Sequence, residues 1–502
     1  MLKRITAGIV VVMAGIVLLA YFVNRSDDIY PTPTGEAGSP GLSAFYRQTL
    51  AWTACGGAVC SWVRVPVDYA KPKGDTIRLR VKFRPAESHH RIGSLLINPG
   101  GPGGSGVDFV GPFIKQAGQS LLEAYDVVGF DPRGVGQSAP LTCLSDRAFD
   151  RYNELDPTPD DPAEIDALDK GFRSVGKACV KGSGELAAHV STAENARDLD
   201  ILRALMGEKD LDYYGASYGT QLGATYASMF PKSVGSMVLD GAVDPERSKE
   251  RQGYGQAKGF ENALRSFLKS CFKKDVCPLG KDAGDAEDRI VALLAQLDDK
   301  PIRTRGERDL TENAAIYGLA YAMYDRKAWS VLTTGLDRAS FGDGTIMLAL
   351  SDQYFGRKND GTYLDNGSRV VNAIRCLDFP KAPSDTTIEG LLPSYEKAAP
   401  VFGAAMAWTA GECRDWPVKS TPQQPIDAKG APPIMVVGTT RDPATPYSWA
   451  KSLAKELDTK LLVTRVGDGH TGYGVGNACV DKAVDAFLVK GTKSKPGLRC
   501  ED

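Results

Sequence analysis

The pattern of apolar and polar positions predicts two kinds of strand. Residues 61–67 and 77–83 alternate between apolar and polar side chains, as strands do when one face meets water. Six later runs are short, continuously apolar and bounded by glycine, proline or aspartate, which is typical of parallel strands covered on both faces. These runs occupy residues 94–98, 125–131, 211–215, 236–240, 433–438 and 460–466. Amphipathic stretches such as 192–205 and 447–457 separate them, so the pattern predicts an α/β fold with a mostly parallel central sheet flanked by helices.

The alternation of strands and helices is interrupted once. About 190 residues separate Asp240 from Pro433 without another buried-strand run. Within them the pattern indicates helices at 260–272, 286–297, 310–323 and 328–339. We interpret this stretch as an inserted helical cap. The predicted organisation is a core formed by residues 45–244 and 429–502, with the cap at 245–428.

The N-terminal segment predicts export. Lys3 and Arg4 precede 19 apolar or small residues, 5–23. Basic residues at such a start stay in the cytoplasm, so the rest of the chain is expected outside it. The run has nearly the ~20 residues of a bilayer span and lacks a small-x-small cleavage site, which favours a membrane tether. A cleaved signal peptide at 1–23 is the alternative, and a proline-containing linker, 24–44, follows in both cases.

Charge and cysteine usage agree with this location. The net charge of −2 gives no electrostatic reason to expect nucleic acid as a partner. There are ten cysteines, none in a C-x-x-C pair, and only four histidines, so a zinc site is not expected. An oxidising compartment would convert the cysteines into five disulfides. Nearest-neighbour pairing is our hypothesis: 55–60, 143–179, 271–277, 376–413 and 479–500.

The strongest chemical signal is the sequence Gly215-Ala216-Ser217-Tyr218-Gly219. It follows an apolar strand and precedes a helical stretch, which is the setting of a nucleophile elbow. The turn is so tight that small neighbours are needed, and it places the serine hydroxyl at a helix N-terminus, where the dipole stabilises negative charge. The alternative is a glycine-rich turn with an incidental serine.

A nucleophilic serine needs a base and an orienting carboxylate. His470 follows the last predicted strand in a glycine-rich loop, whereas the histidines at 89, 90 and 189 lie in segments predicted to be exposed. Asp442 lies just past the preceding strand, and the order Ser217, Asp442, His470 is the one used by hydrolases with this elbow. Asp442 could instead cap the next helix, and Asp468 is a rival orienter only two residues from His470.

Two backbone amides are candidates for an oxyanion hole. One belongs to Tyr218, the residue after the nucleophile. The second is expected in the loop 98–106, where we choose Gly101, with its neighbour Gly100 as the alternative. This loop lacks the Gly-Lys-Ser/Thr ending of a phosphate-binding loop, and its prolines fit a dinucleotide-binding turn poorly. The loop 131–138 is interpreted as structural support beneath it.

Four motifs in this order resemble the secreted tripeptidyl aminopeptidases of actinobacteria, which are relatives of the prolyl aminopeptidases. They are Asn-Pro-Gly-Gly-Pro-Gly-Gly-Ser-Gly at 98–106, Asp-Pro-Arg-Gly-Val-Gly-Gln-Ser at 131–138, the elbow at 215–219 and Gly-Asp-Gly-His at 467–470. The resemblance covers residues 45–502. It implies an α/β-hydrolase core with an inserted cap, no metal or organic cofactor, and release of short peptides from free N-termini. Pro99 stands where prolyl aminopeptidases have histidine, which fits the tripeptidyl branch.

The resemblance also implies groups that recognise the free amine of the substrate. Asp378, within the motif at 373–378, is a candidate for binding the ammonium group, and Glu194 and Asn195 are further candidates. A salt bridge with a nearby arginine is the alternative role for Asp378. Thr445, three residues after Asp442, is expected to brace the triad loop.

The expected partners are peptide substrates with a free N-terminus, with no nucleic acid. The expected location is outside the cytoplasm, either secreted or anchored to the outer face of the cytoplasmic membrane through residues 5–23. Two other functions fit the same motifs. One is an esterase or lipase with the same triad, and the other is a catalytically inactive surface binding protein.

Overall fold

The computed structural model describes most of the chain, namely residues 30–36, 41–88, 90–244, 248–273, 277–379, 381–420 and 422–502. The predicted export segment, 5–23, lies outside the described residues. Within the described ranges, none of the helices has the length and apolar character of a membrane span.

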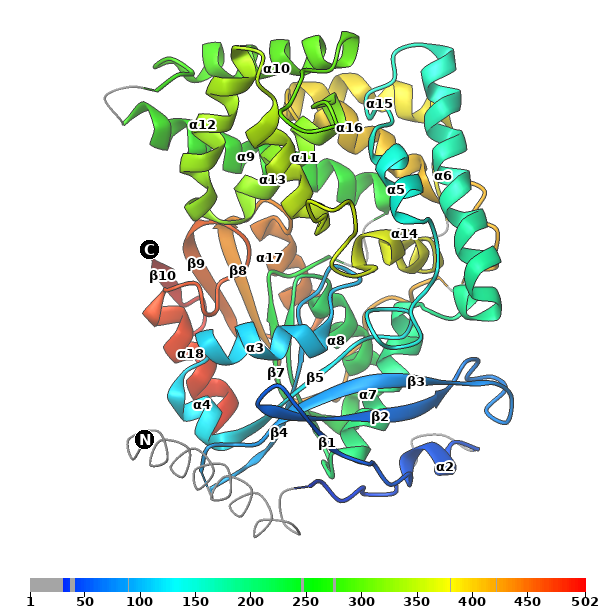
Figure 1. Cartoon of the computed structure of the whole chain (residues 1–502). Coiled ribbons are helices and arrows are strands. Elements are labelled where there is room, and N and C mark those ends of the chain that lie inside the picture. Colours follow the sequence, from blue (N-terminus) through cyan, green and yellow to red (C-terminus); the bar gives the residue numbers. More distant parts are fainter. Residues whose placement is uncertain are drawn as a thin grey trace, which may run out of the picture.

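A ten-stranded sheet forms the lower half of the molecule in Figure 1. Its order is β1-β2-β3-β5-β4-β6-β7-β8-β9-β10. The pairs among β1, β2, β3 and β5 are antiparallel, and all the other neighbours are parallel. The strands are β1 (Thr53–Cys55), β2 (Ala58–Pro66), β3 (Thr76–Arg84), β4 (Gly93–Asn98), β5 (Tyr125–Phe130), β6 (Leu211–Ala216), β7 (Val234–Asp240), β8 (Met435–Arg441), β9 (Leu462–Asp468) and β10 (Arg499–Glu501). The predicted α/β-hydrolase fold with a mostly parallel sheet is confirmed.

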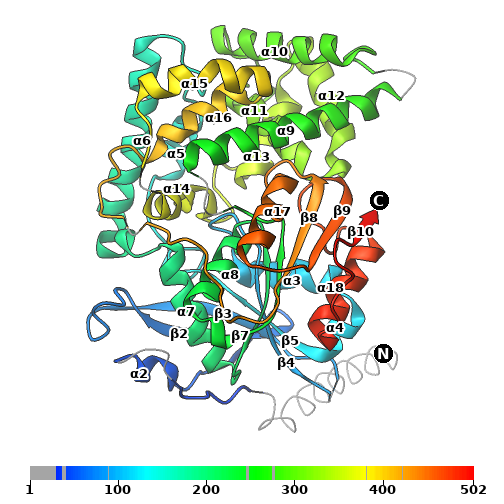
Figure 2. The ribbon, with the colours of Figure 1, turned by 180° about the vertical axis from the view of Figure 1, so that it is seen from behind.

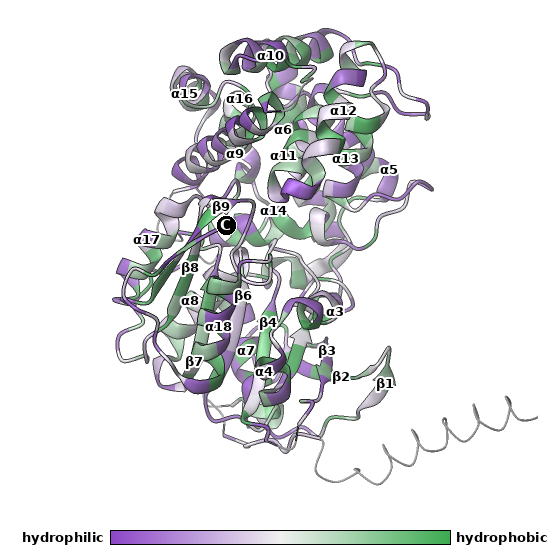
Figure 3. Cartoon of the chain, turned by 90° about the vertical axis from the view of Figure 1, so that its left-hand side faces the viewer, coloured by the Kyte–Doolittle hydropathy of each residue, from purple (hydrophilic) through white to green (hydrophobic). Residues whose placement is uncertain are grey.

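The hydropathy pattern explains where each strand lies. Every residue of β4 and β5 is buried, whereas most of β2 and β3 alternates between buried and more accessible positions. Figure 3 shows the central strands as largely hydrophobic. The eight strands that the pattern predicts are all present. β1 and β10 were not predicted, because three residues are too few to display a period.

Helices cover both faces of the sheet, as Figures 1 and 2 show from opposite sides. On one face, α3 (Gly106–Gln116), α4 (Gln119–Ala124) and α18 (Ala478–Lys490) bury apolar side chains against the parallel strands. On the other face lie α2 (Ser43–Tyr46), α7 (Thr192–Leu205), α8 (Tyr218–Met229) and α17 (Tyr447–Glu456). The carboxyl ends of the parallel strands are left open for the second layer of the molecule.

A layer of helices, which we call the roof, stands above these strand ends (Figure 1). Most of it lies between β7 and β8, where the sequence predicts a cap, and most of the helices in this stretch share a hydrophobic core of their own. These helices are α9 (Lys249–Phe272), α10 (Ala283–Asp299), α11 (Glu312–Tyr324), α12 (Trp329–Ser340), α13 (Thr345–Phe355), α14 (Gly367–Asp378), α15 (Asp385–Ala398) and α16 (Gly403–Trp408).

Two earlier helices join the roof, and the sequence analysis did not foresee them. They are α5 (Asp146–Asn153) and α6 (Pro162–Ser183), which precede β6, the strand that leads to Ser217. Leu168 and Phe172 of α6 pack in one cluster with Ile388 of α15 and Trp408 of α16. The roof is therefore built from two separate stretches of the chain.

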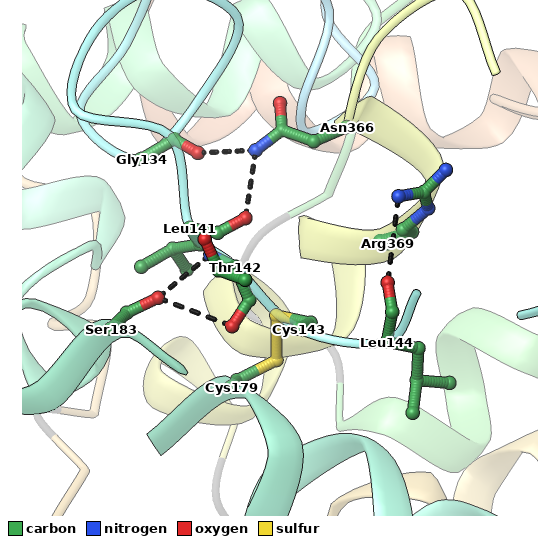
Figure 4. Close-up of a disulfide and its surroundings, with 9 residues drawn as sticks. All are labelled: Gly134, Leu141, Thr142, Cys143, Leu144, Cys179, Ser183, Asn366 and Arg369. Atoms are coloured by element: carbon green, nitrogen blue, oxygen red, sulfur yellow. Dashed lines mark hydrogen bonds between the residues drawn. A yellow bond between two sulfur atoms is a disulfide. The ribbon is translucent and has the colours of Figure 1, made fainter. Parts of the chain in front are cut away.

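All ten cysteines are paired, and the pairing is the predicted one between nearest neighbours. Figure 4 shows one bridge, Cys143–Cys179, which ties the loop before α5 to α6. Disulfides in this number form and persist in oxidising compartments. They indicate that the folded body lies outside the cytoplasm.

Candidate active site

Ser217 lies on a sharp turn between β6 and α8. Its φ of 55° and ψ of −123° belong to a backbone region that residues other than glycine rarely adopt. Its amide donates a hydrogen bond of 2.8 Å to the carbonyl of Asp240 on the neighbouring strand. A Cβ at Gly215 would lie 2.3 Å from the carbonyl oxygen of Gly219, and one at Gly219 would lie 2.9 Å from that of Asn98. The turn therefore has room for glycine alone on both sides of the serine.

His470 and Asp442 form a close pair at the ends of two adjacent strands. The Nδ1 atom of His470 is 2.9 Å from each carboxylate oxygen of Asp442. Asp442 is buried and accepts hydrogen bonds from the amides of Ala444, Thr445 and Thr471. These bonds fix the carboxylate in position to accept a hydrogen bond from His470. Burial lowers the pKa of His470, but the adjacent Asp442 carboxylate outweighs this and raises the pKa above its ordinary value.

The rival carboxylate has another partner. Asp468 forms a two-pronged ion pair with Arg441, at 2.5 and 3.0 Å, whereas Nδ1 of His470 is bonded to Asp442. Thr445 lies beside the pair, with its hydroxyl 3.4 Å from Nδ1 of His470. On the other side the ring of Tyr324 meets the imidazole edge-on at 5.2 Å, and its carbonyl accepts the amide of His470.

Asp240 joins the histidine loop to the elbow, and the sequence analysis missed it. This buried residue ends β7 and binds the Ser217 amide through its main-chain carbonyl. Its carboxylate accepts the amides of Gly472 and Tyr473, both at 2.8 Å, just after His470. A Cβ on Gly241 would lie 3.3 Å from Cε1 of the imidazole, so His470 stands beside the strand end that holds Ser217. The signal was available in the sequence, because Asp240 is a carboxylate at the end of the strand that follows Ser217.

The glycine loop after β4 packs against the elbow. A Cβ at Gly100 would lie 2.8 Å from that of Ser217 and 3.0 Å from the amide nitrogen of Tyr218. Gly100 and Gly101 have φ values of +95° and +112°, which also favour glycine. Gly101, rather than Gly100, lines the cavity beside Ser217 and Tyr218. The Tyr218 amide lies in the first turn of α8, where amides have no partner within the helix.

The loop 131–138 supports this region from below, as the sequence suggests. Asp131 accepts hydrogen bonds from the hydroxyl of Ser105, which caps α3, and from the amide of Gln137. Arg133 is fully buried and forms a two-pronged pair with Asp198 on α7, at 2.7 and 2.8 Å. Both side chains are occupied in holding the loop in place.

A cavity of about 660 Å³ lies between the elbow and the roof. Its size falls in the range of pockets that enclose small ligands. Ser217, Tyr218 and Thr445 form part of its wall. Aromatic side chains contribute much of the rest, including Phe149, Tyr152, Phe172, Tyr317, Tyr324, Tyr354 and Trp408.

Of the three residues predicted to bind the substrate amine, Asp378 lines the cavity. It is buried and accepts the amide and hydroxyl of Thr192, at 2.9 and 2.5 Å, and the amide of Gln221 at 3.3 Å. The pairing with an arginine that we weighed as its alternative role is not among these contacts. Burial raises the pKa of Asp378 to about 7.

Glu194 and Asn195 lie behind the cavity wall instead. Glu194 belongs to the capping box that begins α7 with Ser191, and it binds Nδ1 of His189 at 2.7 Å. The Asn195 amide donates to the carbonyls of Val190 and Ser191. Neither side chain is among the cavity-lining residues of the described chain.

Three groups of potential metal ligands occur among the described residues. Asp156, Asp298 and Glu312 form one, and Asp68, Glu185 and His189 form another. The third joins Glu412 to Cys376 and Cys413, whose thiols are used in a disulfide. None of the groups contains Ser217, His470 or Asp442.

Comparison with known proteins identifies the family of this chain. A family model described as TAP-like protein matches residues 399–500. The serine protease Hip1 of Mycobacterium tuberculosis is 38% identical over 478 residues, which cover 90% of this chain and 91% of the relative. The tripeptidyl aminopeptidase of Streptomyces lividans is 33% identical over 451 residues, covering 88% of this chain and 83% of the relative. The chain belongs to the tripeptidyl aminopeptidase-like family of α/β-hydrolase serine peptidases.

The family predicted from the four motifs is therefore confirmed. Members of similar identity carry different names. A carboxylesterase B of Mycobacterium tuberculosis is 39% identical over 486 residues, covering 93% of this chain and 92% of the relative. Family membership therefore does not decide whether the enzyme hydrolyses amide or ester bonds, and that question depends on the site.

Proposed function

We propose that this chain is an exported serine aminopeptidase that releases short peptides, chiefly tripeptides, from free N-termini through an acyl-enzyme. The observation that carries the proposal is the strained Ser217 in the wall of a cavity beneath the roof, together with the hydrogen-bonded His470–Asp442 pair. A roofed cavity of about 660 Å³ suits a peptide end better than the middle of a folded protein.

The proposed chemistry is acyl transfer. Nε2 of His470 takes the Ser217 proton as the serine oxygen attacks the scissile carbonyl, while Nδ1 stays bonded to Asp442. The amides of Gly101 and Tyr218 stabilise the oxyanion. His470 then protonates the leaving amine, and water hydrolyses the acyl-enzyme by the same route.

Asp378 is the proposed ligand of the substrate ammonium group. It lines the cavity, and a cation beside it would favour its ionised form. Residues 5–23 are proposed to tether the enzyme to the outer face of the membrane. We also propose the division into a core, 45–244 and 429–502, and a cap, 245–428, to which α5 and α6 add.

Ester hydrolysis with the same triad is the second candidate function, favoured by the aromatic wall of the cavity and by the relative named carboxylesterase B. The deciding experiment compares a chromogenic tripeptide with its N-acetylated form and with a short-chain ester. We expect turnover of the free-amine peptide and little of the blocked one. Equal turnover of both peptides, or turnover of the ester alone, would refute the aminopeptidase proposal.

Substitution of the nucleophile tests the catalytic assignment separately. Ser217→Ala should abolish peptide turnover and labelling by a fluorophosphonate probe, while the thermal unfolding temperature stays close to that of the parent. A parent protein that fails to react with the probe would support the inactive binding protein instead.

A further inference from the structure

Arg375, on α14, is a cation of the cavity wall that is left without a partner. In the part of the chain that the structure describes, three basic side chains line the cavity. Lys249 is paired with Glu412, and Arg369 is paired with Asp146. Among the described residues, no hydrogen bond or ion pair reaches the guanidinium of Arg375.

The carboxylates in the described part of the cavity wall have contacts with groups other than Arg375. Glu412 holds Lys249, and Asp378 accepts hydrogen bonds from Thr192 and Gln221. Asp365 accepts the amide of Gly367 at 2.7 Å. None of these three carboxylates forms an ion pair with Arg375, so its guanidinium is the basic group of the described cavity wall that has no acidic partner.

This charge acts on buried neighbours. Burial raises the pKa of Tyr317, Tyr324 and Tyr354, and the positive charge of Arg375 works against that rise. Burial also lowers the pKa of Lys249, and repulsion from Arg375 adds to the effect. These groups line the same cavity as Arg375, and its aromatic wall screens a charge less than bulk water does. Such a site favours a bound anion.

The same charge reaches the neighbourhood of the reaction centre. Arg375, Tyr324 and Ser217 line the same cavity, and the ring of Tyr324 lies edge-on to His470. An anion held by Arg375 would therefore belong to a molecule that occupies the cavity with its reacting bond near Ser217.

The helix that carries Arg375 is fixed at both ends. At its start the Asn366 side chain donates to the carbonyls of Gly134 and Leu141, at 2.9 and 3.1 Å (Figure 4). At its end the Cys376–Cys413 disulfide ties it to the segment after α16. A guanidinium on a fixed helix is preorganised, and its planar set of donors matches a carboxylate.

We propose that Arg375 is a specificity residue that binds a carboxylate of the substrate, supplied either by an aspartate or glutamate side chain or by the C-terminus of a short peptide. The inference rests on the proposed peptidase function. It assigns to this enzyme a preference for acidic peptides, because the guanidinium gains a charged partner only when such a substrate enters.

The experiment uses full-length enzyme and matched peptide pairs. Asp is compared with Asn, and Glu with Gln, at each of the first three positions, and short peptides with a free C-terminus are compared with their amides. One hydrogen-bonded charge pair should favour the carboxylate substrate by roughly 10- to 100-fold in kcat/KM. Arg375→Gln should bring the ratio close to one. Arg375→Lys should give an intermediate ratio, because lysine keeps the positive charge but lacks the planar pair of N–H donors of a guanidinium.

Arg369→Gln is the matched control, since it removes a charge from the same helix and cavity wall that is already paired with Asp146. This variant should keep the preference for the carboxylate member of each pair. Arg375→Glu should reverse the preference toward lysine-containing peptides. Fluorophosphonate labelling of each variant verifies that its site is folded.

The outcomes separate the two proposals. Equal turnover of acidic and neutral peptides by the parent enzyme, or a preference that survives in Arg375→Gln, overturns the role of Arg375 alone. Absence of peptide turnover with either kind of substrate contradicts the proposed function itself. Side-chain preference without C-terminal preference, or the reverse, identifies the source of the carboxylate.

Discussion

Asp240 offers a test of how the elbow and the histidine loop are coupled. Its carboxylate binds the amides of Gly472 and Tyr473 and the hydroxyl of Tyr214. Asp240→Asn keeps the size of the side chain but provides a single carbonyl acceptor, and its amino group would face an N–H donor. We expect the loop that carries His470 to lose one anchor and the imidazole to lose a nearby negative charge.

The stability effect can be worked out from two opposing contributions. Burial raises the pKa of Asp240 to about 6, from the ordinary 3.8. A carboxylic acid whose pKa is higher in the folded than in the unfolded protein lowers the free energy of unfolding once the pH exceeds its pKa in the unfolded protein. A difference of about two pKa units corresponds to about 3 kcal/mol near neutral pH. The lost hydrogen bond costs about 1–3 kcal/mol. Asp240→Asn should therefore leave the free energy of unfolding at pH 7 unchanged or raise it by up to about 2 kcal/mol.

The activity effect has the opposite sign. A displacement of the imidazole by a fraction of an ångström should lower kcat by about 10- to 100-fold. The Asp240 charge contributes to the raised pKa of His470, so the acidic limb of kcat/KM should move to lower pH in the variant. Both results come from peptide kinetics between pH 5 and 9, alongside urea unfolding at pH 5 and pH 7.

Two results would refute this reasoning. Asp240→Asn that unfolds far more readily at pH 7 would show that the carboxylate is chiefly structural. A variant with unchanged kcat and an unmoved acidic limb would show that the contact with the histidine loop has no part in positioning. Tyr214→Phe is a useful control, because it removes one hydrogen bond to Asp240 and leaves its charge and loop contacts intact.

Three further predictions follow from the site. Asp442→Asn should lower kcat by about 10⁴-fold with KM little changed, because Nδ1 of His470 loses its ionised acceptor. Steady-state kinetics measure this effect, and a near-normal kcat would contradict the prediction. In the parent enzyme kcat/KM should fall as pH drops through the pKa of His470, with a midpoint above 6.5, because a protonated imidazole cannot accept the Ser217 proton; a lower midpoint would contradict the raised pKa. Gly100→Ala should abolish activity and lower the free energy of unfolding in urea by about 1–3 kcal/mol, because its Cβ would lie 2.5 Å from the carbonyl oxygen of Ala216. Gly111→Ala is the control: a Cβ there would meet open space, so this variant should keep both activity and stability.

The sequence determined the features that depend on neighbours along the chain. The short apolar runs predicted eight strands, and the run at 192–205 predicted α7 to the residue. The Gly-x-Ser-x-Gly motif predicted the elbow, since two positions without room for a side chain leave few residue choices. The even cysteine count and their spacing predicted all five disulfides, because close pairs along the chain are the easiest to join.

The tertiary structure decided what depends on contacts between distant segments. Asp240 looks like the end of an ordinary strand until the His470 loop, more than 200 residues later, folds onto its carboxylate. Glu194 and Asp378 are both buried acids, and only the packing of α14 against α7 places the second at the cavity. Likewise, the sequence motif at 373–378 does not tell that Arg375 lies in the cavity wall without an acidic partner. Which charged side chains pair depends on how the whole structure packs, so it cannot be predicted from the local sequence pattern.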